Sequence, residues 1–242
     1  MIFRFRSLAG WGVVIGITLT LTLGMGSAAH ATSTFNAAAD FSATLNPNGA
    51  WSYGETPTLG GSFSPLLAGS CGPLTGWNNS GTSDLSGSPP FIFKGTGTCG
   101  TGTPPSGQLD LHPGSGGQFA DVRWTSPSAG SLAVTATFQG IDPTAGGTDV
   151  HVLKNGVLLF SAQITGFGVP TSFTYPGGTV VAGSTLDFVV GVGSDGNFLF
   201  DSTGFNAQIQ PLAGVPEPGS LVLVGSCLVG LAGFTWRRHR RK

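Results

Sequence analysis

Apolar and polar residues alternate along the second half of the chain, in short runs separated by turn-forming residues. Residues 131–138 read SLAVTATF, so that Leu132, Val134, Ala136 and Phe138 fall on one face and smaller or polar side chains on the other. A period of two residues is typical of a β-strand with one buried face. Strands are predicted in this way at residues 108–112, 119–125, 131–139, 149–154, 157–164, 171–175, 185–192 and 205–210.

Asn155 and Gly156 separate two of these runs, VHVLK at 150–154 and VLLF at 157–160. Both residues tolerate the positive φ angles of a type I′ turn, which makes this pair the strongest hairpin signal in the chain. We therefore expect the two runs to form a β-hairpin.

The first half of the body gives weaker signals, with short strands predicted at 51–53, 58–63 and 91–94 between clusters of Gly, Pro, Asn and Ser. Outside the two ends, no segment of twelve or more residues has helical apolar spacing free of Gly or Pro. The pattern predicts an all-β fold, an antiparallel β-sandwich of the jelly-roll type.

Charge distinguishes the middle of the chain from its ends. Residues 32–214 contain three of the ten Lys and Arg residues and ten of the eleven Asp and Glu residues, a formal charge of −7. Phosphate binding needs a basic surface, so this balance argues against a nucleic-acid partner.

The N-terminus has the three parts of a secretory signal peptide. Arg4 and Arg6 precede an apolar run over residues 8–25, and Ala29, His30 and Ala31 give an A-x-A cleavage pattern. We expect cleavage after Ala31, which removes residues 1–31 during export. An uncleaved membrane anchor is the alternative.

Export places the body in an oxidising compartment. Cys71 and Cys99 are then candidates for a disulfide that closes a loop rich in Gly, Pro and Ser, with two free thiols as the alternative. Cys227 lies in the apolar C-terminal segment and is not expected to pair with either of them.

The C-terminus predicts a membrane span. Residues 220–236 carry no charge, and a helix of this length spans about 25 Å at ~1.5 Å per residue, enough for the hydrocarbon core. By the positive-inside rule, the cations that follow act as a membrane stop in the cytoplasm: Arg237, Arg238, Arg240, Arg241 and Lys242. The body is therefore expected outside the cytoplasmic membrane.

Pro216, Glu217 and Pro218 stand directly before this helix, within residues 215–219, where the two prolines keep the backbone extended. With the Gly-containing helix and the terminal Arg cluster they resemble the PEP-CTERM sorting signal. The resemblance implies an exosortase-type membrane protease as partner, a transient membrane anchor that is removed, and delivery to the cell surface or extracellular matrix of a Gram-negative bacterium. Exopolysaccharide and biofilm systems are the usual associates of that family. A plain C-terminal anchor is the alternative.

The body resembles a recurrent ectodomain of PEP-CTERM proteins in five blocks: FSATLNPNGAWSYG at 41–54, LDLHPG at 109–114, VRWTSPSAG at 122–130, DVHVLKNG at 149–156 and LDFVVGVG at 186–193. The same blocks look like strands of jelly-roll carbohydrate-binding modules. We accordingly divide the chain into a signal peptide at 1–31, a β-sandwich ectodomain at 32–213 and a sorting signal at 214–242.

Three aromatic residues are candidate glycan-binding residues, because sugar faces stack on aromatic rings: Trp51, Tyr53 and Trp77. The two tryptophans are flanked by Asn residues in loop-like sequence, where exposed rings with amide partners suit a glycan. Packing of these rings under long loops is the alternative.

Catalytic constellations are scarce. The body holds two histidines, His112 and His151, and no G-x-S-x-G elbow, and an acidic exported domain needs no catalytic explanation for its carboxylates. We expect no enzyme activity and no cofactor except calcium, for which Asp195, Asn197 and Asp201 are candidates in a Gly-containing loop. Turn formation is the alternative role of these residues.

The sequence thus predicts an exported, non-catalytic surface or matrix protein that associates with extracellular polysaccharide. A structural or adhesive matrix protein without glycan affinity is the alternative, and a secreted hydrolase is the third hypothesis.

Overall fold

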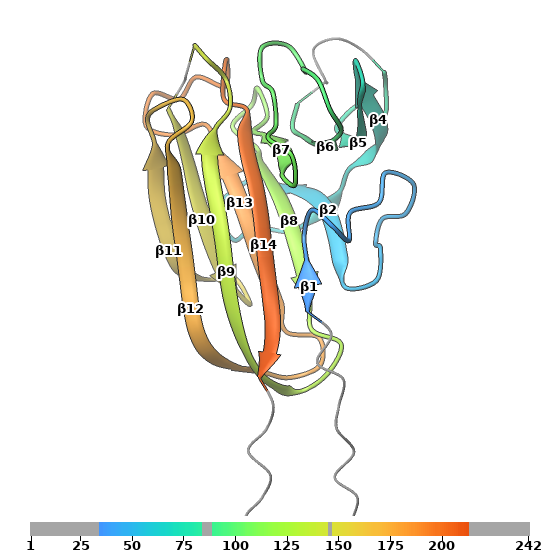
Figure 1. Cartoon of the computed structure of the whole chain (residues 1–242), viewed down its shortest axis with the longest axis vertical. Coiled ribbons are helices and arrows are strands. Elements are labelled where there is room, and N and C mark those ends of the chain that lie inside the picture. The colour runs from blue at the N-terminus through green and yellow to red at the C-terminus, as the bar shows by residue number, and fades with distance from the viewer. Residues whose placement is uncertain (1–33, 84–88, 145–146, 213–242) are drawn as a thin grey trace, which may run out of the picture.

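The computed structural model describes residues 34–83, 89–144 and 147–212. Within these ranges the regular elements are β-strands without a helix, and two antiparallel sheets pack face to face (Figure 1). This confirms the predicted all-β antiparallel sandwich. The signal peptide with Ala29 and Ala31, the Pro216–Glu217–Pro218 motif, the span at 220–236 and the basic tail at 237–242 lie outside the described residues.

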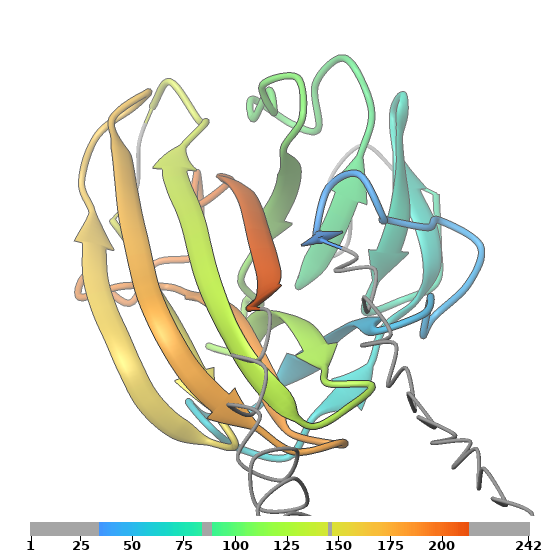
Figure 2. The ribbon, with the colours of Figure 1, turned by 60° about the horizontal axis from the view of Figure 1, so that its bottom comes forward.

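The larger sheet has eight strands in the order β12-β9-β14-β7-β6-β5-β4, with β1 paired to β14. It curves around one side of the molecule when the lower end of the sandwich is turned toward the viewer (Figure 2). Its strands are β1 (Phe35–Asn36), β4 (Leu67–Cys71), β5 (Leu74–Asn78), β6 (Phe91–Lys94), β7 (Leu109–His112), β9 (Gly130–Gly140), β12 (Pro170–Val180) and β14 (Thr203–Leu212).

The smaller sheet has six strands in the order β11-β10-β13-β8-β2-β3. Its strands are β2 (Trp51–Thr56), β3 (Ser64–Pro65), β8 (Phe119–Thr125), β10 (Thr148–Lys154), β11 (Val157–Ile164) and β13 (Thr185–Gly191). Strand β11 forms one edge of this sheet, and β12, which follows it in the chain, forms the neighbouring edge of the larger sheet.

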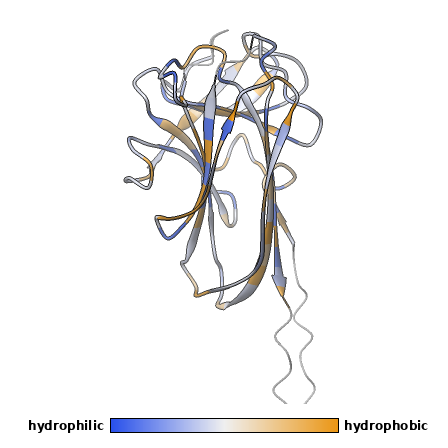
Figure 3. Cartoon of the chain, turned by 90° about the vertical axis from the view of Figure 1, so that its left-hand side faces the viewer, coloured by the Kyte–Doolittle hydropathy of each residue, from blue (hydrophilic) through white to orange (hydrophobic). Residues whose placement is uncertain are grey.

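Alternation of side chains builds the core between the sheets. On β9 the predicted inward set Leu132, Val134, Ala136 and Phe138 is buried, while residues between them are more exposed. Phe205 of β14 lies between Phe138 of its own sheet and Phe188 of the opposite sheet, with ring centroids 5.0 and 5.2 Å away. Figure 3 shows the two layers edge-on, with hydrophobic and hydrophilic residues interleaved along the strands.

The hairpin predicted at Asn155 and Gly156 is confirmed. Strands β10 and β11 pair directly across it, and the two turn residues have φ angles of 51° and 77°, as a type I′ turn requires. The Asn155 side chain also accepts a hydrogen bond from the Thr185 N–H at 2.8 Å, which ties the turn to β13.

In the first half of the body, the strands predicted at 51–53 and 91–94 are confirmed by β2 and β6, but the rest departs from the prediction. Residues 58–63, predicted as a strand, form a loop after β2, because Gly60 takes a positive φ of 71° and Gly61 closes a turn onto the Thr58 carbonyl. Strands β4 and β5 lie in sequence rich in Gly, Ser and Cys that gave no strand signal.

The two ends of the described body lie together. Phe35 of β1 pairs with Ile209 near the end of β14, and both strands reach the same end of the sandwich in Figure 1. The loops after β7, β9 and β13 lie at the opposite end, which we call the distal end. In the described part of the chain, no helix has the length and hydropathy of a membrane span.

Candidate functional site

The outer face of the six-stranded sheet carries a group of polar residues. On β8, Ala120, Val122 and Trp124 enter the core, so that Asp121 and Arg123 point outward. Strand β13 follows the same rule and directs Thr185, Asp187 and Val189 to the same outer face. The two-residue period therefore collects charge on one face of two neighbouring strands.

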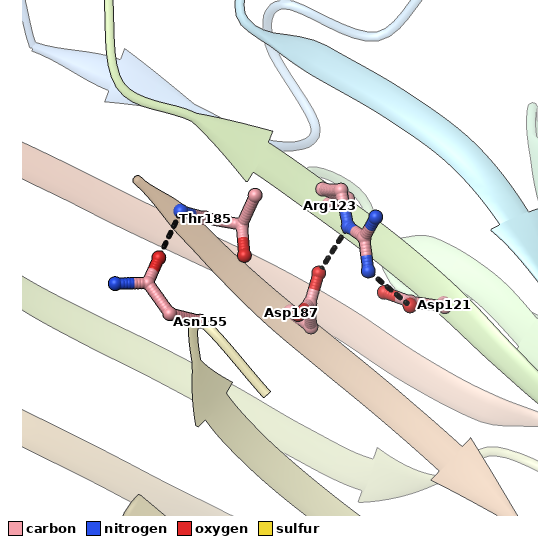
Figure 4. A network of polar contacts seen from close by, with 5 residues as sticks. All are labelled: Asp121, Arg123, Asn155, Thr185 and Asp187. Atoms are coloured by element: carbon pink, nitrogen blue, oxygen red, sulfur yellow. Dashed lines mark hydrogen bonds and ion pairs between the residues drawn. The ribbon is translucent and has the colours of Figure 1, made fainter. Parts of the chain in front are cut away.

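Arg123 lies between two carboxylates of this face (Figure 4). It stands directly opposite Asp187 in the β8–β13 ladder, and its Nε donates to Asp187 Oδ1 at 2.5 Å. Its second contact is with Asp121 Oδ2, 3.9 Å from the guanidinium nitrogen. The Arg123 guanidinium is thus shared between two buried carboxylates.

The loop at residues 57–63 lies over this network. The Phe63 ring packs on Gly54, where an added Cβ would lie 2.3 Å from the ring, and its centroid is 4.3 Å from the Arg123 guanidinium carbon. Gly60 approaches Leu153 and the carbonyl of Gly156 at the hairpin. A loop placed on the outer face explains why Leu153 is buried there although it points away from the core.

Between the loop and the sheet lies an open cavity of about 180 Å³, which we call the β8–β13 pocket. Glycines and the apolar residues Leu153 and Val189 form part of its wall. Its polar lining consists of Thr56, Asp121, Arg123, Asn155, Thr185 and Asp187.

Two polar atoms of the pocket lining are buried without a partner. Thr56 and Asp121 are 2% and 1% exposed, and neither Thr56 Oγ1 nor Asp121 Oδ1 has a hydrogen-bond partner among the described residues. Burial and the neighbouring Asp187 raise the pKa of Asp121 well above its usual range, against the lowering effect of Arg123. Buried polar atoms normally find a hydrogen-bond partner, so the pocket is suited to water or to a small ligand that carries hydroxyl groups.

A second cavity of about 160 Å³ lies at the distal end, beside the loop that contains Cys99. His112 is one of its lining residues: its Nδ1–H donates to the Pro113 carbonyl at 2.8 Å, and burial lowers its pKa to about 4. The lining also includes the Thr101 hydroxyl, which donates to Asp142, and the exposed Phe200. This distal pocket is smaller and has fewer free polar atoms than the β8–β13 pocket.

The predicted glycan-binding rings are not exposed, and that prediction is wrong. Trp51, Tyr53 and Trp77 are 1%, 0% and 6% exposed, because each is an inward residue of its strand. The indole N–H groups of the two tryptophans make hydrogen bonds within the protein. Nε1 of Trp51 donates to Asp40 Oδ2 at 3.2 Å, and Nε1 of Trp77 donates to the Ser42 carbonyl at 2.8 Å.

Two of the candidate calcium ligands, Asp195 and Asn197, accept hydrogen bonds from the backbone of their own loop. Asp195 Oδ1 accepts the Asn197 N–H and Asn197 Oδ1 accepts the Leu199 N–H, each at 3.1 Å, which is the turn-forming role. Asp201 is buried, and no set of three or more His, Cys, Asp or Glu side chains in the described ranges is placed to hold a metal ion.

The disulfide predicted between Cys71 and Cys99 is present, with Cα atoms 5.3 Å apart. It is part of a small apolar cluster with Leu74, Phe91 and Phe93 on the outer side of the larger sheet. The bridge therefore attaches the loop at residues 95–107 to that sheet.

The sequence did not predict the residues of the β8–β13 pocket. A signal existed, because Asp121, Arg123 and Asp187 are charged residues at alternate positions of strands that are otherwise apolar, and so had to share an outer face. The contribution of Thr56 had no local signal, since it depends on pairing between β2 and β8.

Comparison with solved structures gives partial similarities. The chain matches the CBM51-2 and INT domains of Clostridium perfringens ZmpB in complex with GlcNAc at 15% identity and a TM-score of 0.33, over 44% of this chain and 22% of that one. It matches the C-terminal CBM6 of the laminarinase LamC from Zobellia galactanivorans at 13% identity and a TM-score of 0.29, over 45% and 86%. Pika GITRL matches at 21% identity and a TM-score of 0.25, over 39% and 78%. These values are too low to assign a ligand.

No curated protein matches the chain. Residues 214–241, however, match the family model described as the PEP-CTERM protein-sorting motif. That range contains the Pro-Glu-Pro sequence, the apolar segment and the Arg cluster on which the resemblance rested. The chain therefore carries a PEP-CTERM protein-sorting motif, which indicates an exported protein processed by an exosortase.

Proposed function

We propose that this chain is a surface or extracellular-matrix protein whose jelly-roll-type sandwich binds a glycan of the exopolysaccharide in the β8–β13 pocket, without catalysis. The precursor is exported by its signal peptide, anchored in the inner membrane by residues 220–236 and released by an exosortase. The sorting motif supports the route, and the pocket supports the binding step.

One observation carries the glycan part of this proposal: Thr56 and Asp121 line the same open cavity, and each has a buried side-chain oxygen, Thr56 Oγ1 and Asp121 Oδ1, without a hydrogen-bond partner among the described residues. A sugar hydroxyl both donates and accepts hydrogen bonds, so one ligand can satisfy both atoms. Leu153 and Val189 give the apolar contact that a sugar ring also needs.

Binding is tested by retention of the full-length chain on immobilised exopolysaccharide from a producing strain, in a detergent without a sugar headgroup. Thr56→Val and Asp121→Asn are expected to lower retention at least about tenfold, the effect of one lost buried hydrogen bond. Thr174→Val is the matched control, because Thr174 is exposed on β12 of the opposite sheet. Equal retention of all three variants and the wild type contradicts the proposed site.

The processing step is tested in a strain that lacks the exosortase. There the protein is expected to stay in the membrane fraction with residues 214–242 intact. Release at the wild-type level in that strain would contradict the sorting route.

A structural or adhesive role without glycan affinity is the second candidate. Strand β11 favours it, because this strand is a sheet edge with Val157, Leu158 and Leu159 exposed. Such an edge offers free backbone groups and apolar side chains to a neighbouring strand. Under this second function, Val157→Lys should weaken retention of the protein in the matrix. Neither the purified wild type nor the purified variant should then bind polysaccharide.

A further inference from the structure

The β8–β13 pocket contains one cation and two carboxylates. Asp187 already accepts from Arg123 Nε at 2.5 Å, and Asp121 lies on the other side of the guanidinium. Both carboxylates are almost fully buried, so solvent does little to screen them. Whether or not Asp121 holds a proton, the pocket has no unpaired positive charge for an acidic ligand.

The residues around the pocket do not supply an unpaired positive charge either. Besides Arg123, the described residues include two Lys side chains, Lys94 and Lys154, and both are engaged elsewhere. The Lys94 ammonium donates to the Ala38 carbonyl, and the Lys154 ammonium donates to the Thr179 carbonyl at 2.5 Å. His151, opposite Val189 on the same outer face, is paired with Asp149 at 2.7 Å. Because residues 32–214 carry a formal charge of −7, an anionic ligand would approach through a field of its own sign.

The free polar groups of the pocket suit hydroxyl groups. Thr56 Oγ1 and Asp121 Oδ1 have no partners among the described residues. Asn155 uses its Oδ1 for the Thr185 N–H, which leaves its amide N–H groups free to donate toward a ligand. The site thus offers both acceptors and donors, without a charge to be neutralised.

The size of the cavity limits the ligand. At about 180 Å³ it is smaller than the roughly 300–1,000 Å³ of sites for drug-sized ligands. The loop at 57–63 bounds it on one side and the hairpin at Asn155 and Gly156 on another. One sugar residue at a chain end or side branch fits this geometry better than an extended run of several residues.

From this geometry we infer, resting on the proposed glycan function, that the β8–β13 pocket takes a single neutral sugar residue and rejects uronic acid residues. The specificity comes from the pairing of Arg123 with Asp187 and Asp121, which leaves no cation for a carboxylate. Release of Arg123 from Asp187 should therefore open the site to an acidic sugar.

The test compares matched ligands that differ in one group: methyl glucoside against methyl glucuronide, and methyl galactoside against methyl galacturonide. Binding to the full-length chain, in a detergent without a sugar headgroup, is followed by ligand-observed NMR at low salt. The neutral member of at least one pair is expected to bind at least about tenfold more tightly than its acidic partner. The ratio should shrink as salt is added.

Asp187→Asn is expected to shift that ratio about tenfold toward the uronide, since it frees the guanidinium. Asp195→Asn is the matched control: it removes the same charge from an exposed loop outside the pocket and should leave the ratio unchanged. If Asp187→Asn does not fold, the salt dependence of the wild-type ratio tests the same electrostatic claim.

The outcomes separate this inference from the proposed function. Equal or tighter binding of the uronides overturns the inference and leaves glycan binding intact. Binding of polysaccharide with no binding of any monosaccharide glycoside overturns the single-residue part. Failure of both polysaccharide and glycosides to bind overturns the proposed function itself.

Discussion

The rings of Tyr53 and Trp77 stack across the sandwich, with centroids 6.2 Å apart and an interplanar angle of 7°. Tyr53 belongs to β2 of the six-stranded sheet and Trp77 to β5 of the eight-stranded sheet, so this stack joins the two layers. The Phe41 ring packs edge-on against the Tyr53 ring, and their centroids are 4.7 Å apart. Aromatic residues that looked like a binding surface are therefore core residues.

Trp77→Ala is expected to destabilise the protein by about 3–5 kcal/mol, because it removes a large buried ring and leaves a cavity between the sheets. The measurement is the free energy of unfolding in denaturant. Trp77→Phe keeps part of the ring volume and should lose less. If Trp77→Ala instead abolished polysaccharide binding at unchanged stability, the core assignment would be wrong.

Removal of the Cys71–Cys99 bridge is expected to lower the free energy of unfolding by about 3–4 kcal/mol, because the bridge closes a loop with a sequence separation of 28 residues. The double variant Cys71→Ser with Cys99→Ser is compared with the wild type, with and without reductant. Reductant should destabilise the wild type alone. Retention on exopolysaccharide should persist under conditions where the variant stays folded, since the bridge lies on the opposite sheet from the β8–β13 pocket.

The strands of the second half could be predicted because each buries one face, so that the two-residue period is visible in the sequence of β8, β9, β10 and β13. In the first half, the strands predicted at 51–53 and 91–94 are confirmed as β2 and β6. Strands β4 and β5 could not be predicted, because they contain glycines and are stabilised by pairing and by the disulfide rather than by side-chain alternation. The charged residues of β8 and β13 could be read from the sequence, but the loop at residues 57–63 that covers the pocket could not. Its position depends on Phe63, which packs on Gly54 and Arg123, and no local sequence pattern specifies these contacts.

Stability is expected to fall as the pH rises from about 4 to about 8, and to level off above that. Burial is the main factor that raises the pKa of Asp110 and of Asp201 to about 8, and for Asp201 the charges of Asp195 and Asp149 add to it. Each folded carboxyl holds a proton that the unfolded chain has released above about pH 4, so the free energy of unfolding falls with pH until the folded carboxyls also ionise near pH 8.

The measurement is the free energy of unfolding at several pH values in this window. Asp110→Asn and Asp201→Asn should each remove part of the slope, because an amide keeps the neutral form at every pH. His112 acts in the opposite sense at lower pH: burial lowers its pKa to about 4, so its contribution is lost as the pH falls from about 6.5 toward 4. A slope between about pH 4 and about pH 8 that both Asn variants leave unchanged would contradict this assignment.

Gly193 and Gly196 offer a matched pair for the packing of the distal loops. Both have positive φ angles, 70° and 65°, so alanine at either position should cost about 1–2 kcal/mol in backbone strain. At Gly193 an added Cβ would also lie 1.5 Å from the Gly147 carbonyl oxygen, whereas nothing lies within 4 Å at Gly196. Gly193→Ala must therefore displace the backbone of the loop between β9 and β10 and should destabilise the protein clearly more than Gly196→Ala. Thermal or denaturant unfolding of the two variants measures the difference, and equal losses would mean that the two loops do not pack as closely as the Gly147–Gly193 contact requires.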